Sequence, residues 1–182
     1  VPGWPVFTGG PGTPSQITAS PAIADLDRDG ANEIVVASER NGGRVHVLRS
    51  DGTNFPGWPK DVPALTAQVR TSSPVLADLD GDTFLDVIFA GSDGRLWAWN
   101  RNGGVLAGFP VVFYTEGGEA TQSTPSVGDL DGDGQLEIVL GDEKGRVHGF
   151  NHDGTPVAGF PIQLGGEVRS TPIIWDIDND GL

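Results

Sequence analysis

The sequence predicts an all-β protein assembled from β-propeller blades, each a four-stranded antiparallel sheet, and two observations support this prediction. An acidic Asp-x-Asp-x-Asp word begins at Asp25 and returns at Asp78, Asp129 and Asp176, so the chain repeats itself about every 50 residues. Short runs of β-branched and aromatic residues, bounded by glycine-containing turns, fill the rest of each repeat. Four such strands in a repeat of about 50 residues match the size of a propeller blade.

We therefore expect residues 1–182 to form a single open or partial propeller domain, with three full blades and parts of a fourth. The repeats are placed approximately at 3–56, 57–107, 108–158 and 159–182.

The strands of each repeat are expected in a fixed order. The central hairpin has its first strand at residues 33–37, 86–90 and 137–141 and its second at 44–48, 95–99 and 146–150. Asp-Gly or Asn-Gly turns then follow at 51–52, 102–103 and 153–154. A fourth strand is expected to contain the Gly-aromatic-Pro word, which occurs at 3–5, 57–59, 108–110 and 159–161. A Ser-Pro or Thr-Pro pair precedes each acidic word, at 20–21, 73–74, 124–125 and 171–172.

The composition agrees with this architecture and excludes several classes of protein. With 28 glycines and 14 prolines the chain has many turns, yet 37% hydrophobic residues is too much for a disordered protein. The net charge of −14 excludes a nucleic-acid-binding protein and an anionic-membrane binder, because both need a basic surface. No run approaches the roughly 18–20 apolar residues of a membrane span, so membrane insertion is not expected.

Two residue types are absent. Without cysteine there is no disulfide, no thiolate metal site and no cysteine nucleophile. Without methionine, Val1 is not a translation start, so we expect a processed product or part of a longer protein.

The second hairpin strands carry large side chains on one face and small ones on the other. The large residues are His46, Trp97 and His148 together with Leu48, Trp99 and Phe150, whereas Val47, Ala98 and Gly149 occupy the small face. This alternation predicts packing between stacked blades. A sugar-stacking platform at Trp97 and Trp99 is the alternative. An open stack also leaves an apolar blade face at each end, so we expect self-association or a longer propeller.

The acidic words predict cation sites. Carboxylates at positions 1, 3 and 5 of a tight loop converge on one point, position 9 is again acidic, and position 7 offers a backbone carbonyl. All-oxygen coordination with a high ligand number favours Ca²⁺ over Mg²⁺, with three to four ions in all. The candidate ligands are Asp25, Asp27, Asp29, Ala31 and Glu33; Asp78, Asp80, Asp82, Phe84 and Asp86; Asp129, Asp131, Asp133, Gln135 and Glu137; and Asp176, Asp178 and Asp180.

An EF-hand and a solvated acidic turn are the two other interpretations of these loops. An EF-hand needs a bidentate Glu at position 12, where this chain has Val36, Phe89 and Leu140, so that interpretation fails. Solvated acidic turns without an ion are the simpler alternative. Thr83 replaces the glycine found at the same place in the other loops, so the second site is expected to bind more weakly.

The combination of acidic loop, Ser/Thr-Pro pair and Gly-aromatic-Pro word resembles the FG-GAP or VCBS-type repeat of integrin α-subunit propellers and of secreted bacterial proteins. The resemblance covers essentially the whole chain. It implies that the carboxylates at positions 1, 3, 5 and 9 of the first three loops are calcium ligands. Family propellers usually close with about seven blades, which leaves ring closure open for this chain.

The expected function is a non-catalytic, calcium-scaffolded module for extracellular recognition or adhesion, with a protein or glycan ligand. Its rim would carry Arg70, Gln122 and Arg169. Two alternatives are the propeller part of a polysaccharide lyase or hydrolase and a spacer domain of a secreted protease. The acidic residues outside the loops and turns show no recognisable acid/base pair. Low-affinity calcium sites favour an extracellular or cell-surface location. Trp175, which replaces a small residue of the other repeats, is expected to pack.

Overall fold

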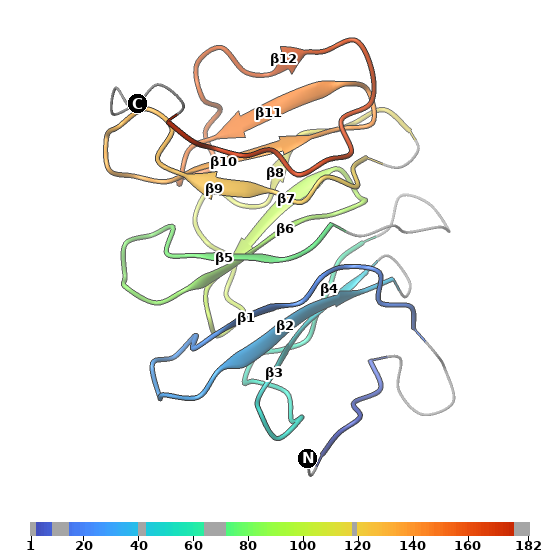
Figure 1. The fold of residues 1–182 in the computed structure, drawn as a ribbon, viewed down its shortest axis with the longest axis vertical. Helices are drawn as coiled ribbons and strands as arrows, with labels where there is room; N and C mark the ends of the chain where they lie inside the picture. The colour runs from blue at the N-terminus through green and yellow to red at the C-terminus, as the bar shows by residue number, and fades with distance from the viewer. Residues whose placement is uncertain (1–2, 9–14, 40–42, 64–71, 118–119, 177–182) are drawn as a thin grey trace.

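The computed structural model describes residues 3–8, 15–39, 43–63, 72–117 and 120–176. These residues form three four-stranded antiparallel sheets, stacked along the long axis of the molecule (Figure 1). No helix capable of crossing a membrane occurs among them. The prediction of an all-β protein made of four-stranded blades is confirmed.

The sheets repeat one topology, in which every strand pairs with the next strand along the chain. Sheet one contains β1 (Ala22–Ala24), β2 (Glu33–Ser38), β3 (Arg44–Leu48) and β4 (Lys60–Asp61). Sheet two contains β5 (Val75–Ala77), β6 (Asp86–Ala90), β7 (Arg95–Trp99) and β8 (Val111–Val112). Sheet three contains β9 (Ser126–Gly128), β10 (Glu137–Gly141), β11 (Arg146–Phe150) and β12 (Ile162–Gln163). The predicted central hairpins are therefore confirmed.

The fourth strand of each sheet differs from the expectation. β4, β8 and β12 begin directly after the Gly-aromatic-Pro words instead of containing them. Proline has no N–H to donate to a strand ladder, so the word lies before the strand. As a result, each sheet ends inside the next sequence repeat, and the repeats at 57–107 and 108–158 each contribute strands to two sheets.

Apolar side chains fill two layers between the sheets. Within the layer between sheets one and two, Trp99 stacks on Trp97 with ring centroids 5.3 Å apart and meets Trp58 edge-on at 5.8 Å. The layer between sheets two and three includes Ile88, Ala98, Ile138, Leu140 and Phe150. The packing role predicted for Trp97 and Trp99 is confirmed, because both rings lie in the first layer.

The Gly-aromatic-Pro words hold neighbouring sheets together. A Cβ built on Gly57 would lie 1.9 Å from the carbonyl oxygen of Asn102, and a Cβ on Gly108 would lie 1.9 Å from that of Asp153. Asn102 and Asp153 belong to the Asx-Gly turns (residues 51–52, 102–103 and 153–154) that follow the third strand of each sheet. Only glycine permits so close an approach of two backbones.

Side chains of the same words add to this contact. The indole N–H of Trp58 donates to the carbonyl of Arg101 at 2.8 Å, and that of Trp4 donates to Ser50 at 2.9 Å. The word at 57–59 thus precedes a strand of sheet one while packing on a turn of sheet two. It ties the two sheets together.

Candidate metal centres

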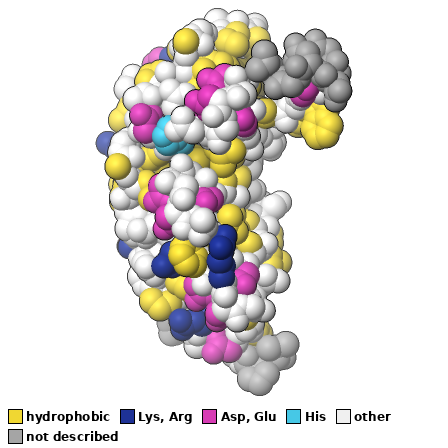
Figure 2. All heavy atoms as spheres, turned by 90° about the vertical axis from the view of Figure 1, so that its left-hand side faces the viewer, with side chains coloured by type: hydrophobic (Ala, Val, Ile, Leu, Met, Phe, Trp, Pro, Cys, Tyr) yellow, Lys and Arg dark blue, Asp and Glu magenta, His cyan; other side chains and the backbone are white. Residues whose placement is uncertain are grey.

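Three acidic loops lie along one side of the sheet stack. Acidic loop one (residues 25–33) joins β1 to β2, acidic loop two (78–86) joins β5 to β6, and acidic loop three (129–137) joins β9 to β10. In Figure 1 the three loops project to the same side, and Figure 2, which faces that side, shows Asp and Glu side chains in clusters along it. The repeated topology therefore places equivalent carboxylates at the same edge of successive sheets.

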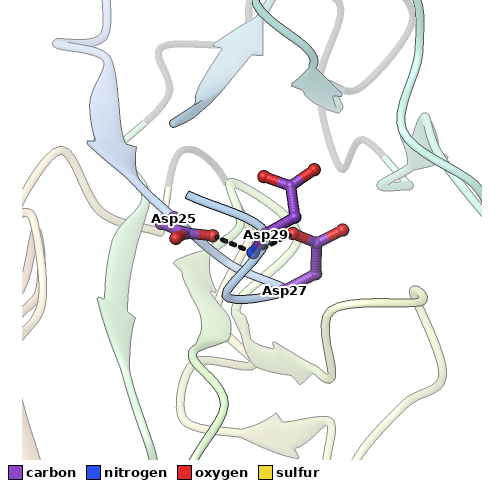
Figure 3. Close-up of side chains that lie close together, drawn as sticks. All are labelled: Asp25, Asp27 and Asp29. Atoms are coloured by element: carbon purple, nitrogen blue, oxygen red, sulfur yellow. Dashed lines mark hydrogen bonds between the residues drawn. The ribbon is translucent and has the colours of Figure 1, made fainter. Parts of the chain in front are cut away.

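Backbone N–H groups organise the carboxylates of each loop in the same way. In loop one, Gly30 donates to Asp25 Oδ2 at 2.9 Å, Asp29 donates to Asp27 Oδ1 at 3.2 Å, and Ala31 donates to Asp29 Oδ1 at 2.7 Å. Equivalent bonds occur in loops two and three. The Asp-x-Asp-x-Asp spacing thus folds into a series of Asx turns whose carboxylates gather together, as Figure 3 shows for loop one.

The acid at position 9 is buried at the start of the second strand. Its carboxylate accepts a hydrogen bond from the leucine N–H at position 2 of the same loop: Glu33 from Leu26 at 3.0 Å, Asp86 from Leu79 at 2.9 Å and Glu137 from Leu130 at 2.7 Å. Each loop is therefore closed at its base by a carboxyl group removed from water.

Burial and like charge disfavour ionisation of these groups. Burial, opposed by the hydrogen bond from Leu79 and reinforced by the neighbouring aspartates of loop two, raises the pKa of Asp86 to about 7. Burial is also the largest cause of the raised pKa of Glu33 and of Glu137. A cation among the carboxylates would offset both effects.

Ligand-capable oxygens meet in each loop. Within three groups, one carboxylate oxygen from each residue lies within 4.8 Å of the others: Asp25, Asp27 and Asp29; Asp78, Asp80 and Asp86; and Asp129, Asp131 and Glu137. In loop two, Oδ1 of Asp78 is buried and accepts no hydrogen bond. A buried carboxylate oxygen without a partner fits a bound cation, and the all-oxygen donor set fits a hard one.

The other predicted ligands either lie outside these three groups or are not fully described by the structure. Asp82 and Asp133 stand at position 5, outside the groups that meet in loops two and three, although each accepts the N–H of position 7. The role of the carbonyls of Ala31, Phe84 and Gln135 stays a prediction. In the fourth loop Asp176 is half-buried, whereas Asp178 and Asp180 lie outside the described residues.

Two positions of each of the three described acidic loops have positive φ, and among these three only loop three has glycine at both. Position 4 is Arg28 in loop one, with φ of 63°, and position 6 is Thr83 in loop two, with φ of 74°. A β-branched residue in this region is strained. The substitution noted in the sequence therefore falls at a position where glycine is favoured.

A polar hollow of about 520 Å³ lies at the opposite end of the strands. Its described lining residues are Gln16, Thr18, Ala19, Glu39, Ser73, Gln122 and Thr124, which belong to all three repeats. The Ser/Thr-Pro pairs bring them together, because Ser73 Oγ accepts from Ser20 N at 3.0 Å and Thr124 Oγ1 accepts from Ser73 N at 3.1 Å. The pairs can be recognised in the sequence, but this role cannot, because the bonds join different repeats.

The rim candidates lie near this end of the sheets. Gln122 Nε2 donates to Glu143 at 3.1 Å, and Arg169 forms an ion pair with Glu143 at 3.0 Å. Arg70 lies outside the described residues. Trp175 does not pack as expected, because 78% of it is exposed at the open end of the stack.

Several of the described acidic residues outside the loops make polar contacts. Asp61 pairs with Arg44, and both Glu116 and Asp142 pair with Arg146. The carboxylate of Glu39 accepts the hydroxyl of Thr18.

Comparison with known proteins identifies the repeat. The family model described as FG-GAP-like repeat matches residues 25–89 and 78–140, which together make up more than half of the chain. No curated protein matches the sequence.

Solved propeller structures share the fold at low sequence identity. The computationally designed Ika4 protein is 16% identical with a TM-score of 0.57, and the match covers 88% of this chain and 81% of that one. BamB from Moraxella catarrhalis is 16% identical with a TM-score of 0.51, covering 82% of this chain and 37% of BamB. The designed Ika8 protein is 17% identical with a TM-score of 0.50, covering 86% and 39% respectively. The chain thus spans well under half of BamB and of Ika8. With its three acidic loops on successive sheets, the chain belongs to the FG-GAP-like repeat family, and its described residues form a partial β-propeller.

Proposed function

We propose that this chain is a calcium-binding, non-catalytic propeller module of an extracellular protein, and that it serves in recognition or adhesion. The observation that carries the proposal is the convergence of carboxylate oxygens in three equivalent loops. The buried and unpartnered Oδ1 of Asp78 supports it further. Asp25, Asp27 and Asp29 would hold the ion of loop one, Asp78, Asp80 and Asp86 that of loop two, and Asp129, Asp131 and Glu137 that of loop three.

Calcium suits these loops better than magnesium. Ca²⁺ accepts six to eight oxygen ligands in flexible geometry, whereas Mg²⁺ demands octahedral geometry and keeps several waters. Three divalent ions would also cancel six of the fourteen net negative charges. Free Ca²⁺ near 10⁻³ M, as found outside cells, would fill sites of low affinity. In a chain without cysteine, the ions would take the stabilising role that disulfides have in many secreted domains.

The recognition surface would be the end opposite the acidic loops. There the polar hollow offers a carboxylate, an amide and hydroxyl groups, including those of Glu39, Gln122 and Thr124. Such groups can hydrogen-bond the hydroxyls of a glycan or the backbone of a protein loop. The ions would act at a distance from this surface by fixing the strands that carry it.

Calorimetric titration and thermal unfolding test the metal proposal. We expect Ca²⁺ to bind and to raise Tm. A free Ca²⁺ concentration of about 100 times the Kd of a site raises the free energy of unfolding by about 2.7 kcal/mol. For a domain of this size that corresponds to a rise of roughly 5–10 °C per saturated site. Mg²⁺ should give a smaller rise. Asp80→Asn should remove one site, whereas Asp61→Asn, at an exposed carboxylate outside the loops, should remove none. Absence of both Ca²⁺-dependent heat and a Tm shift would refute the calcium role.

The non-catalytic part of the proposal needs a separate test. Calcium-loaded protein should bind a component of a glycan or protein array without changing it, and Glu39→Gln should weaken that binding. New reducing ends or unsaturated products from an acidic polysaccharide would instead establish an enzyme.

A further inference from the structure

The aspartates at position 5 of the three acidic loops differ in their surroundings. Asp29 of loop one belongs to the group whose oxygens lie within 4.8 Å of one another, whereas Asp82 of loop two and Asp133 of loop three lie outside their groups. One oxygen of these carboxylates behaves alike in all three loops, because Oδ1 accepts the backbone N–H of position 7. What differs is the contact of the second oxygen, Oδ2.

A side chain pairs with this second oxygen in loops two and three. The side-chain amide of Gln135 donates to Oδ2 of Asp133 at 3.0 Å, and Nη1 of Arg101 lies 3.8 Å from Oδ2 of Asp82. Among the described residues, no other side chain pairs with a carboxylate of loops one to three. In loop one, position 7 is Ala31, which has no side-chain donor.

Arg101 is held in its place by two contacts of its own. Its guanidinium carbon lies 3.5 Å from the ring centre of Phe84, which is position 7 of loop two. Its backbone carbonyl accepts the indole N–H of Trp58 at 2.8 Å. A guanidinium that stacks on an aromatic ring keeps its planar donors in a fixed direction. Position 7 therefore acts in both loops, since Gln135 is itself the donor and Phe84 supports the arginine that pairs with the aspartate.

The acids at position 9 do not distinguish the loops in this way. Glu33, Asp86 and Glu137 are all buried, and each accepts the leucine N–H of position 2. A carboxylate that is paired with a donor must give up that pairing before the same oxygen can bind a cation. Among the three described loops, this competition falls on position 5 of loops two and three and spares loop one.

We propose that Gln135 and Arg101 are affinity-determining residues of the cation sites. Each competes with the cation for one carboxylate oxygen, so loop one binds its cation more tightly than loops two and three. Loading is then graded, and loop one fills at the lowest Ca²⁺ concentration. This inference rests on the proposed calcium-binding function and adds to it the order of affinities and the side chains that set it.

Calorimetric titration with Ca²⁺ tests the order in full-length chains that each keep one intact loop. The other two described loops are disabled by asparagine at position 3, and the fourth loop is disabled throughout. The substitutions are Asp27→Asn, Asp80→Asn, Asp131→Asn and Asp178→Asn. The chain that keeps loop one should have the lowest Kd.

Exchanging the position-7 residues of loops one and three tests the cause. Gln135→Ala should lower the Kd of loop three roughly threefold to tenfold, because a hydrogen bond that competes with the cation is lost. Ala31→Gln should raise the Kd of loop one by a similar factor, whereas Ala31→Leu, of similar length but without a donor, should not. In the otherwise wild-type chain, the Ca²⁺ concentration that gives half of the rise in Tm provides a second measurement that needs no disabled loop. It should fall for Gln135→Ala and rise for Ala31→Gln.

Arg101→Gln separates positioning from folding, because its two effects have opposite signs. Loss of the stacking on Phe84 should lower the Tm of the calcium-free chain. Release of Asp82 should nonetheless lower the Kd of loop two roughly twofold to fivefold, a modest factor because the ion pair is partly exposed. Arg28→Gln is the matched control. The Arg28 guanidinium carbon lies 5.5 Å from the centre of the same ring, yet it pairs with no described carboxylate, so the Kd of loop two should change less.

The outcomes distinguish this inference from the calcium proposal. Unchanged Kd values in Gln135→Ala and Ala31→Gln, or equal effects of Arg28→Gln and Arg101→Gln, would overturn the inference while Ca²⁺ still binds. A loop one that binds no more tightly than the other two would do the same. Absence of Ca²⁺ binding by the wild type would refute the calcium role itself.

Discussion

Gly108→Ala should destabilise the chain far more than Gly159→Ala, although both glycines stand in the same word with similar φ angles. In both variants, an alanine at positive φ lowers the free energy of unfolding by about 1–2 kcal/mol. Because alanine has less conformational freedom than glycine in the unfolded chain, about 0.4–1 kcal/mol of this loss is recovered. Only Gly108→Ala adds a clash, because its Cβ would lie 1.9 Å from Asp153 O, whereas real contacts of this kind are not found below 3.0 Å.

The two backbones must therefore separate by about 1.1 Å in Gly108→Ala. Overpacking of this kind costs typically 1–3 kcal/mol, and here it falls on backbone that cannot rotate away. We expect a total loss of about 2–4 kcal/mol for Gly108→Ala and about 1 kcal/mol for Gly159→Ala. The difference corresponds to a Tm for Gly108→Ala that is lower by roughly 2–12 °C.

Urea unfolding at low protein concentration measures both losses, with the intrinsic fluorescence of the five tryptophans, among them the buried Trp99, as the probe. Equal midpoints for the two variants would show that the word does not join sheets two and three.

Three further outcomes follow from single residues. Burial lowers the pKa of His46 to about 4, so the unfolded chain, with a histidine pKa near 6.5, binds the extra proton. Stability should therefore fall as pH drops from about 6.5 to 4, by on the order of 3 kcal/mol, and His46→Leu should flatten this part of a Tm-against-pH curve. Trp58→Phe should cost about 1 kcal/mol in urea unfolding through loss of the bond to Arg101; no cost would deny that bond a role. Thr83→Gly should relieve positive-φ strain and raise the calcium affinity of loop two severalfold by calorimetry; unchanged affinity would contradict this.

The strands of the central hairpins could be predicted from the sequence because their signals are local. Residues 87–90 are apolar, 93–94 form a turn, and 95–99 pair back along them, as the pairing of Ile88 with Ala98 shows. The acidic loops could also be predicted from the sequence. Alternate aspartates form a tight turn through hydrogen bonds from their carboxylates to backbone N–H groups two residues further along the chain.

Features that depend on contacts between sheets could not be predicted in this way. The sequence alone does not distinguish the short Gly-aromatic-Pro word from part of a strand. Its position between two sheets depends on a contact with a distant turn, since Trp58 bonds the carbonyl of Arg101, 43 residues away. The hollow that contains Glu39 and Gln122 requires three repeats to be stacked. Trp175 was expected to pack because local composition cannot tell whether a partner surface is present.

Two kinds of contact therefore stabilise different levels of this fold. The acidic loops act within one sheet, because Asp25 and Glu33 come from the ends of adjacent strands of sheet one. The Gly-aromatic-Pro words act between sheets, as Trp58 does by leading into β4 while bonding sheet two. In a linear stack of repeats, stability is the sum of repeat terms and nearest-neighbour terms. On this basis the acidic loops, with any cations they hold, would set the first kind of term, whereas the words set the second.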